Sequence, residues 1–216
     1  MNFETSKNLS GVGAILLFVS PIVGAATGFA TGVLGLIGFI LLLIGAYGLA
    51  QYYREAGIFN NILYGTIVGI VGGIVAVVVA AWAAISMLPE LLEKIYPTWN
   101  GDWTTLPNMT PDTSNLAIGD FSPFLGIIFA VVVIVFIVTI IMAIFYRKSL
   151  TMLSAKTGIG LFGTTGTILL IGAVLTIIFI GAVLVWVAML LLAIAFFQTR
   201  PPPPQPSMPT ENIPPM

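Results

Sequence analysis

Hydrophobic residues gather in four long blocks along the chain, with short polar segments between them. The blocks cover residues 11–50, 58–87, 123–146 and 158–197. A helix that crosses a bilayer needs about 20 mostly apolar residues. The second and third blocks therefore each predict one membrane span. The first and fourth blocks are about twice that length, which predicts a hairpin of two spans in each.

Each long block contains a break at which its two helices are expected to turn. In the first block, glycines recur over residues 24–32, and glycine is a poor helix former that tolerates the dihedral angles of a turn. In the fourth block we expect the break near residues 176–181, which leaves two helices of about 17 residues, the lower limit for crossing a bilayer. A re-entrant hairpin, which enters and leaves on one side, is therefore an alternative for residues 158–197.

The pattern as a whole predicts an all-α fold, a polytopic helical membrane protein with about six transmembrane helices, in which two helical hairpins flank two longer spans. Residues 1–10 form the N-terminus, residues 88–122 the one extracytoplasmic loop, and residues 198–216 the tail. Lysine and arginine collect in cytoplasmic segments, and this threading puts all seven of them except Lys94 inside. We therefore expect a multi-pass protein of the cell membrane with both termini in the cytoplasm.

The loop and the tail each carry a local pattern. Residues 89–96 predict a short amphipathic helix that begins at Pro89 and lies on the membrane surface. Asn100 and Gly101 then predict a tight turn. Prolines crowd the tail from Pro201 onwards, which predicts an extended or disordered proline-rich segment.

Composition agrees with a bilayer as the main solvent and excludes several kinds of chemistry. Hydrophobic residues make up 58% of the chain and charged residues 7%, whereas a soluble domain is about a quarter charged. The net charge of −1 offers no basic surface to nucleic acid. The chain has no cysteine and no histidine, which excludes disulfides, iron–sulfur clusters, and haem or zinc sites that need those ligands. We therefore predict no metal, no cofactor and no nucleic-acid partner.

No Asp, Glu, Lys or Arg falls inside a predicted span. Ion-coupled transporters, proton pumps and voltage sensors usually need such groups within the membrane. A pore lined by backbone carbonyls or hydroxyls stays open as an interpretation. The best-placed acid–base groups are Glu90 and Glu93 of the loop, and no nucleophile accompanies them in sequence. We therefore predict no catalytic residue and expect the protein not to be an enzyme.

Glycines recur at helical spacing on two of the predicted helices. Such faces, often called glycine zippers, let helix backbones approach closely, either within one chain or at the seam of a homo-oligomer. One face crosses the turn of the first hairpin, and the other belongs to the third span. The predicted helix-packing residues are Gly24, Gly28, Gly32, Gly65, Gly69 and Gly73.

Hydroxyl groups cluster in the fifth predicted helix at Thr164, Thr165 and Thr167. One interpretation is a polar lining for a permeant or a lipid head group. The other is that each threonine bonds back to a carbonyl of its own helix, as threonines in membrane spans commonly do.

Several short stretches together resemble a known family. They are residues 2–9, 52–55, 58–61, 166–172 and 195–197, which read NFETSKNL, YYRE, IFNN, GTILLIG and AFF. In this order they resemble an archaeal membrane family catalogued as a domain of unknown function, number 996, and the likeness covers nearly all of residues 1–200. The resemblance implies an archaeal cell membrane and carries no activity onto any residue.

These observations favour a non-catalytic role. The leading hypothesis is a scaffold or accessory subunit that acts through helix packing, with membrane lipid and a homo-oligomer or larger membrane complex as its partners. The alternative is a channel or carrier for an uncharged or lipidic solute, lined by the threonines. An enzyme at the membrane interface is the third hypothesis.

Overall fold

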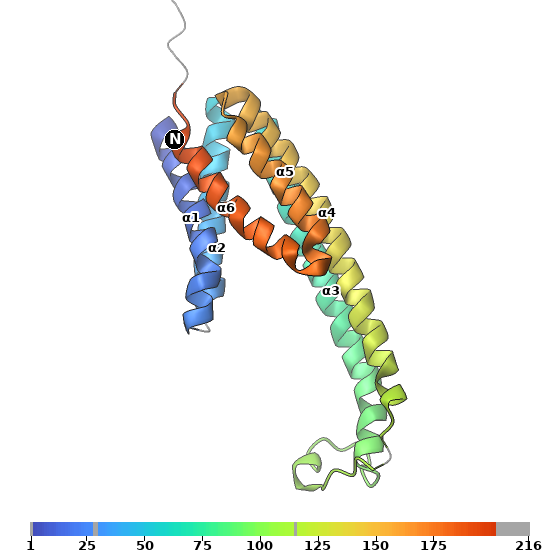
Figure 1. Ribbon diagram of the computed structural model, residues 1–216. Coiled ribbons are helices and arrows are strands. Elements are labelled where there is room, and N and C mark those ends of the chain that lie inside the picture. The colour runs from blue at the N-terminus through green and yellow to red at the C-terminus, as the bar shows by residue number, and fades with distance from the viewer. Residues whose placement is uncertain (1, 28–29, 115, 202–216) are drawn as a thin grey trace, which may run out of the picture.

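The computed structural model describes residues 2–27, 30–114 and 116–201, and every regular element in these ranges is helical (Figure 1). Gly28 of the predicted helix-packing face and residues 202–216 of the predicted tail lie outside the described residues. The elements are α1 (Phe3–Thr27), α2 (Ala30–Tyr52), α3 (Ala56–Ile95), η1 (Leu106–Asn108), η2 (Ile118–Phe121), α4 (Ser122–Thr157), α5 (Gly160–Leu175), η3 (Thr176–Ile178) and α6 (Ile180–Gln198).

The predicted fold class is confirmed. Among the described residues, six helices are long and apolar enough to cross a membrane. The protein is therefore an all-α, multi-pass helical membrane protein. Its helices form because long apolar runs in a bilayer must satisfy their backbone hydrogen bonds internally, and an α-helix does so within one segment.

The helices differ greatly in length, and this sets the shape of the molecule (Figure 1). α3 has 40 residues and α4 has 36, so they are about 60 Å and 54 Å long at 1.5 Å per residue. They pack side by side as an antiparallel pair. The α1–α2 hairpin and the shorter α5 and α6 stand beside one half of this pair, and α6 runs obliquely from α4 back to α1 (Figure 1).

One end of the bundle, which we call the charged end, holds both described termini and the α2–α3 and α4–α5 connections. Rings of Phe3 and Tyr52 lie 4.8 Å apart there. Lys156 pairs with Glu55 over 3.2 Å between Nζ and Oε2. The opposite end, which we call the loop end, holds residues 96–114 and 116–121 (Figure 1).

Tight packing is concentrated at the charged end. The largest buried side chains belong to residues close to helix ends there, namely Leu49, Ile58, Leu153, Phe162 and Phe196. By contrast, the last part of α3 and the first part of α4 run on past the tips of both hairpins (Figure 1), and we take residues 77–95 and 118–130 as this extension. We call this extension the α3–α4 arm. Its apolar side chains are largely exposed because no other helix among the described residues covers it.

Two helices run further than the hydrophobic blocks. α3 does not end near residue 87, and the amphipathic helix expected from Pro89 is the last part of α3 itself. A proline in a helix removes one N–H donor, and the bonds on either side hold the helix together. α4 likewise continues past residue 146 to Thr157, where Gly158 ends it in the left-handed conformation with φ 73°.

The fourth hydrophobic block turns within the range expected from the sequence. α5 ends at Leu175, η3 makes a single turn, and α6 begins at Ile180. Phe179 has φ 62°, a left-handed conformation that is uncommon for a residue with a bulky side chain. Gly181 contacts the backbone of Gly172 and Thr176, so the two helices meet closely just beside the turn.

Candidate functional site

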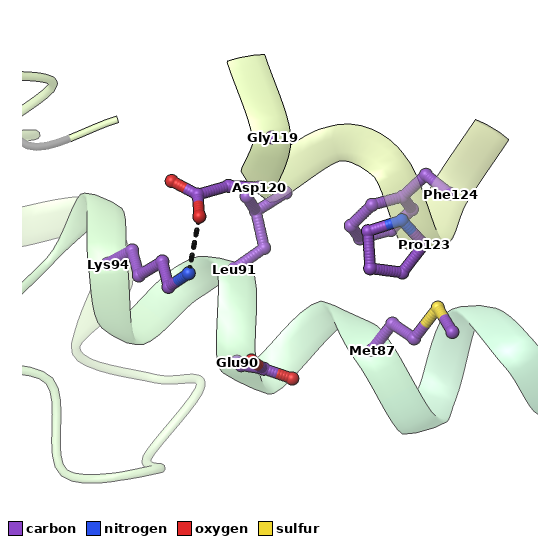
Figure 2. Close-up of a pocket in the computed structure, with 8 residues that line it drawn as sticks. All are labelled: Met87, Glu90, Leu91, Lys94, Gly119, Asp120, Pro123 and Phe124. Atoms are coloured by element: carbon purple, nitrogen blue, oxygen red, sulfur yellow. Dashed lines mark hydrogen bonds and ion pairs between the residues drawn. The ribbon is translucent and has the colours of Figure 1, made fainter. Parts of the chain in front are cut away.

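The α3–α4 arm ends in a pocket of about 330 Å³ at the loop end (Figure 2). The last turns of α3 supply one wall, and η2 with the start of α4 supplies the other. Apolar residues form the side towards the membrane, and charged residues form the side towards the loop. The lining residues are Met87, Glu90, Leu91, Lys94, Gly119, Asp120, Pro123 and Phe124.

An ion pair closes the polar side of this pocket. The Lys94 ammonium donates to Asp120 Oδ1 over 2.6 Å, and Asp120 Oδ2 accepts the backbone N–H of Ala117 over 2.9 Å. Figure 2 shows the Lys94 side chain pointing at Asp120, while Glu90 lies one turn earlier on α3. Both Asp120 oxygens are therefore engaged, so this carboxylate is positioned to link two segments of chain and is poorly placed to abstract a proton.

The sequence pattern favoured Glu90 and Glu93 and did not distinguish Asp120 from the other acidic residues of the loop. Both glutamates are exposed, and only Glu90 is among the residues that line the pocket. Lys94 and Asp120 are 26 residues apart, and the intervening loop has no periodic pattern that would predict their contact. In the described part of the chain no three His, Cys, Asp or Glu residues are grouped so as to hold a metal ion.

Two aspartates organise the loop itself. The Thr104 hydroxyl and backbone N–H donate to Asp102 Oδ1 over 2.7 Å and 2.9 Å, and these bonds hold the pKa of Asp102 below its usual value. The Ser114 hydroxyl and backbone N–H do the same for Asp112 and lower its pKa. Both are local Asx-type turns, which explains why polar residues gather in this segment.

The tryptophans of the loop pack on one of these turns. Trp99 is buried, and its indole N–H donates to the Asp102 carbonyl over 2.9 Å. The rings of Trp99 and Trp103 meet edge to face with centroids 5.2 Å apart. The loop therefore has an ordered fold of its own at the tip of the arm.

A second hollow lies between the helices, towards the charged end. It measures about 250 Å³, is almost entirely apolar, and draws at least one residue from each of the six long helices. We call it the central cavity. It is lined by Leu17, Phe39, Leu42, Ile62, Met142, Tyr146, Leu150, Leu169, Met189 and Leu192. Its lining has the chemistry of a site for a hydrocarbon chain.

The three threonines singled out in the sequence lie on α5, where each hydroxyl donates to a carbonyl four residues earlier. Thr164 bonds to Gly160, Thr165 to Leu161 and Thr167 to Gly163, over 3.3, 2.8 and 3.1 Å. Thr165 is buried and Thr164 is exposed, so the three side chains point in different directions. The residue that α5 contributes to the central cavity is Leu169. A path for a solute lined by these hydroxyls therefore stays a prediction.

The predicted helix-packing glycines have different surroundings. A Cβ placed on Gly65 would lie 2.7 Å from the Tyr146 ring, and one on Gly69 would lie 2.6 Å from the Met142 sulfur. Both residues therefore pack against α4. Gly73 faces open space, and so does Gly32 of the first hairpin, while Gly24 is buried.

Another close backbone approach between helices, besides that of Gly181 to α5, lies in the α1–α2 hairpin. A Cβ on Gly13 would be 2.5 Å from the Gly38 carbonyl oxygen and 2.6 Å from the Leu42 nitrogen. Gly45 likewise meets the side chain and backbone of Ser10. The sequence pattern did not predict these glycines as packing residues, because they are not spaced four apart. Small residues that recur on the facing helix, such as Ser6 and Ser10, are the feature of the sequence that could have indicated this close packing.

Comparisons with known proteins place the chain in a family. A model of the family described as "Protein of unknown function (DUF996)" matches residues 34–190, well over half of the chain. The chain belongs to this family. The match begins inside α2 and ends inside α6, so the DUF996 segment contains the whole arm, the loop and the α5–α6 turn. The family resemblance predicted from short sequence stretches is thereby confirmed.

One relative with a similar sequence is an uncharacterized protein of Methanocaldococcus jannaschii. The two are 24% identical over 199 residues, which cover 91% of this chain and 93% of the relative. The similarity therefore extends over all six long helices and the loop. No solved structure matches this chain.

Proposed function

We propose that this DUF996 protein is a non-catalytic membrane scaffold or accessory subunit that binds a helix of another subunit through the α3–α4 arm. The observation that carries the proposal is the uncovered apolar surface of the arm. Trp82 of α3 is 71% exposed and Phe129 of α4 is also 71% exposed. Helix association in a bilayer is driven by van der Waals packing, and the uncovered side chains of the arm offer surface for it.

The glycines of α3 support this proposal, because some pack within the chain and one is uncovered. Tyr146 and Met142 of α4 pack against Gly65 and Gly69, so these two glycines make contacts within the chain. Gly73 lies at the base of the arm with open space over its Cα. A partner helix can therefore approach the α3 backbone closely at Gly73 and continue along the arm.

Site-directed crosslinking tests this proposal, because the chain has no cysteine of its own. Trp82→Cys places a single thiol on the arm, and Ile171→Cys places one on an exposed position of α5 as the matched control. A reagent with a maleimide arm for this thiol and a photoreactive benzophenone arm, applied to native membranes and irradiated, is expected to trap a discrete larger species with Trp82→Cys and not with Ile171→Cys. Equal crosslinking of the two variants, together with a strictly monomeric purified particle, contradicts the proposal.

The charge distribution supports one orientation of the scaffold. The described basic residues other than Lys94 belong to segments at the charged end, for example Arg54, Arg147 and Lys156. We place this end, with both termini, in the cytoplasm by the positive-inside rule. An impermeant thiol reagent should then label Ser114→Cys from the outside of intact cells. Labelling of Ser114→Cys only from the cytoplasmic side contradicts this orientation.

A second candidate function, the binding or carriage of a lipidic solute, is favoured by the central cavity. Its apolar lining and its place among all six helices suit one hydrocarbon chain. Leu42→Trp should fill the cavity, and native mass spectrometry should then show less retained lipid than with the unmodified chain. Retention of the same lipid by both proteins contradicts this candidate.

A further inference from the structure

The apolar run of α4 provides a depth scale for the membrane. Residues 123–146 of α4 carry no charge, and the run is bounded by Asp120 at the loop end and Arg147 at the charged end. At 1.5 Å per residue the run is about 36 Å long, which matches a hydrocarbon core of about 30 Å crossed by a moderately tilted helix. The middle of this run, near Val135, therefore marks the bilayer midplane.

The turn between α5 and α6 lies at that midplane. A pocket of about 290 Å³ separates the turn from α4, and the turn residues that line it are Thr176, Ile177 and Phe179. The α4 residues that line the same pocket are Val131, Val132, Val135, Phe136 and Thr139. These positions centre on Val135, so the turn is about 17 Å from either end of the apolar run.

The register of α5 against α4 gives the same depth independently. A Cβ on Gly166 would lie 3.1 Å from the Arg147 Cα, so Gly166 is level with the charged boundary of the run. Gly163, one turn earlier, contacts Ser154, which lies beyond that boundary. Only residues 166–175 of α5 therefore lie beside the apolar run. They extend about 14 Å along it, which is half of the hydrocarbon core.

The chemistry of the turn fits hydrocarbon and does not fit water. Phe179 is 85% exposed at the turn, and its neighbours Ile177, Ile178 and Ile180 are exposed as well. Turns in water are usually built from Gly, Asn, Asp, Ser and Pro, as the loop of this chain is around Asn100. Within the α5–α6 turn the Phe179 N–H donates to the Thr176 carbonyl over 3.0 Å, which satisfies that donor without water.

We propose that α5 and α6 form a re-entrant hairpin, which enters the membrane from the charged end and turns back at the bilayer midplane. Neither α5 nor α6 then enters the loop-end leaflet, and the pocket between the turn and α4 takes hydrocarbon chains of the lipids in that leaflet. This placement does not depend on the scaffold function or on which end faces the cytoplasm.

Thiol accessibility in sealed proteoliposomes distinguishes the re-entrant hairpin from two full crossings. Single cysteines are introduced as Ile177→Cys at the turn, Ser114→Cys in the loop and Lys156→Cys at the charged end. An impermeant maleimide should label the loop and charged-end variants from opposite sides. The turn variant should react from neither side until the membrane is dissolved in a denaturing detergent. Labelling of Ile177→Cys from the side that labels Ser114→Cys overturns the proposal, and so does labelling from the other side.

A depth measurement separates a buried turn from one that is merely shielded. Spin labels on the same three cysteines are compared for collision with oxygen, which concentrates in the membrane centre, and with a polar nickel complex, which stays in water. The label at residue 177 is expected to lie deepest, deeper than one at Leu125→Cys near the loop end of α4. Phe179→Cys serves as a second turn variant. A depth at the turn no greater than that of Leu125→Cys overturns the proposal.

Discussion

Trp186 of α6 holds the backbone of α1 at Phe18. Its indole N–H donates to the Phe18 carbonyl over 2.7 Å, and the two rings stack with centroids 4.7 Å apart and planes within 8°. The two residues are 168 positions apart in sequence. This contact joins the first hairpin to the last helix. Nearer the charged end, the Phe197 ring of α6 packs on Gly11 of α1 and joins the same two helices.

Trp186→Phe is expected to weaken the fold by about 0.5–1.5 kcal/mol, because the ring stack survives and the hydrogen bond is lost. Trp186→Ala removes the stack as well and should destabilise the protein further. Unfolding in mixed micelles with increasing SDS measures both changes. Trp82→Phe is the control, since Trp82 is exposed on the arm and its loss should leave unfolding unchanged. A Trp186→Phe protein as stable as the control variant contradicts this prediction.

Gly13→Ala should destabilise the α1–α2 hairpin by about 1–3 kcal/mol, because the new methyl meets backbone atoms of Gly38 and Leu42 that cannot rotate away. Gly73→Ala meets nothing within this chain and replaces a poor helix former, so a gain of up to about 1 kcal/mol is expected. The same SDS titration compares the two. Similar effects from both substitutions mean that Gly13 is not a site of close packing.

How far the sequence predicts this structure depends on how local each feature is. The helices and the turn at residues 176–179 follow from hydrophobic runs and their interruptions, which each segment carries within itself. The Gly13–Gly38 approach and the Lys94–Asp120 pair depend on which faces meet in space. In a bilayer every helix face is apolar, so hydrophobic periodicity does not tell a packed face from a lipid-facing one.

Even a local signal misled where a continuing helix overrode it. Pro89 predicts the start of a helix, yet it lies inside α3, since the apolar residues before it and the amphipathic residues after it share one helical axis. The threonines of α5 show the opposite case. Their sequence leaves both a polar lining and a bond to the helix backbone open, and only the folded structure locates each hydroxyl on a carbonyl of its own helix.

Acid is expected to loosen the loop before it affects the helices. The pKa values of Asp102 and Asp112 are lowered in the folded protein, so their bonds to Thr104 and Ser114 stabilise the loop above the unfolded aspartate pKa of about 4. That stability is lost as the pH falls through the lower folded pKa values. The fluorescence of Trp99 and Trp103 should change in this range.

Asp102→Asn provides the control for this pH dependence. Asparagine keeps an oxygen that accepts from Thr104 and does not titrate, so the acid-induced change in tryptophan fluorescence should shrink. An unchanged pH profile in Asp102→Asn assigns the transition to other groups.

Ile178→Asp should impair membrane insertion of the last hairpin, because a carboxylate near the bilayer midplane costs about 2.5–3.5 kcal/mol. Ile118→Asp is the matched control at the loop end, where the side chain is 91% exposed beside the polar loop. Insertion efficiency and the yield of monodisperse protein measure the difference. Equal tolerance of the two aspartates indicates that the turn lies in water.

Glu90→Gln combined with Glu93→Gln should leave the biological phenotype of the producing strain intact. Both carboxylates are exposed, and neither is held beside a nucleophile in the described residues. Membrane level and oligomeric state of the double variant serve as controls for folding. Loss of the phenotype with these unchanged would place chemistry at the loop-end pocket and argue against a non-catalytic role.

The unequal lengths of the helices give the molecule the form of a wedge. Near the charged end six helices, each about 10 Å across, must fit into one leaflet, whereas α5 and α6 turn back before the other leaflet and α3 and α4 alone reach the loop end (Figure 1). Lipids of the first leaflet are therefore pushed apart more than those of the second. A bilayer relieves this mismatch in area by bending so that the more crowded leaflet forms the outer side of the curve. We expect the protein to gather where the membrane already bends that way.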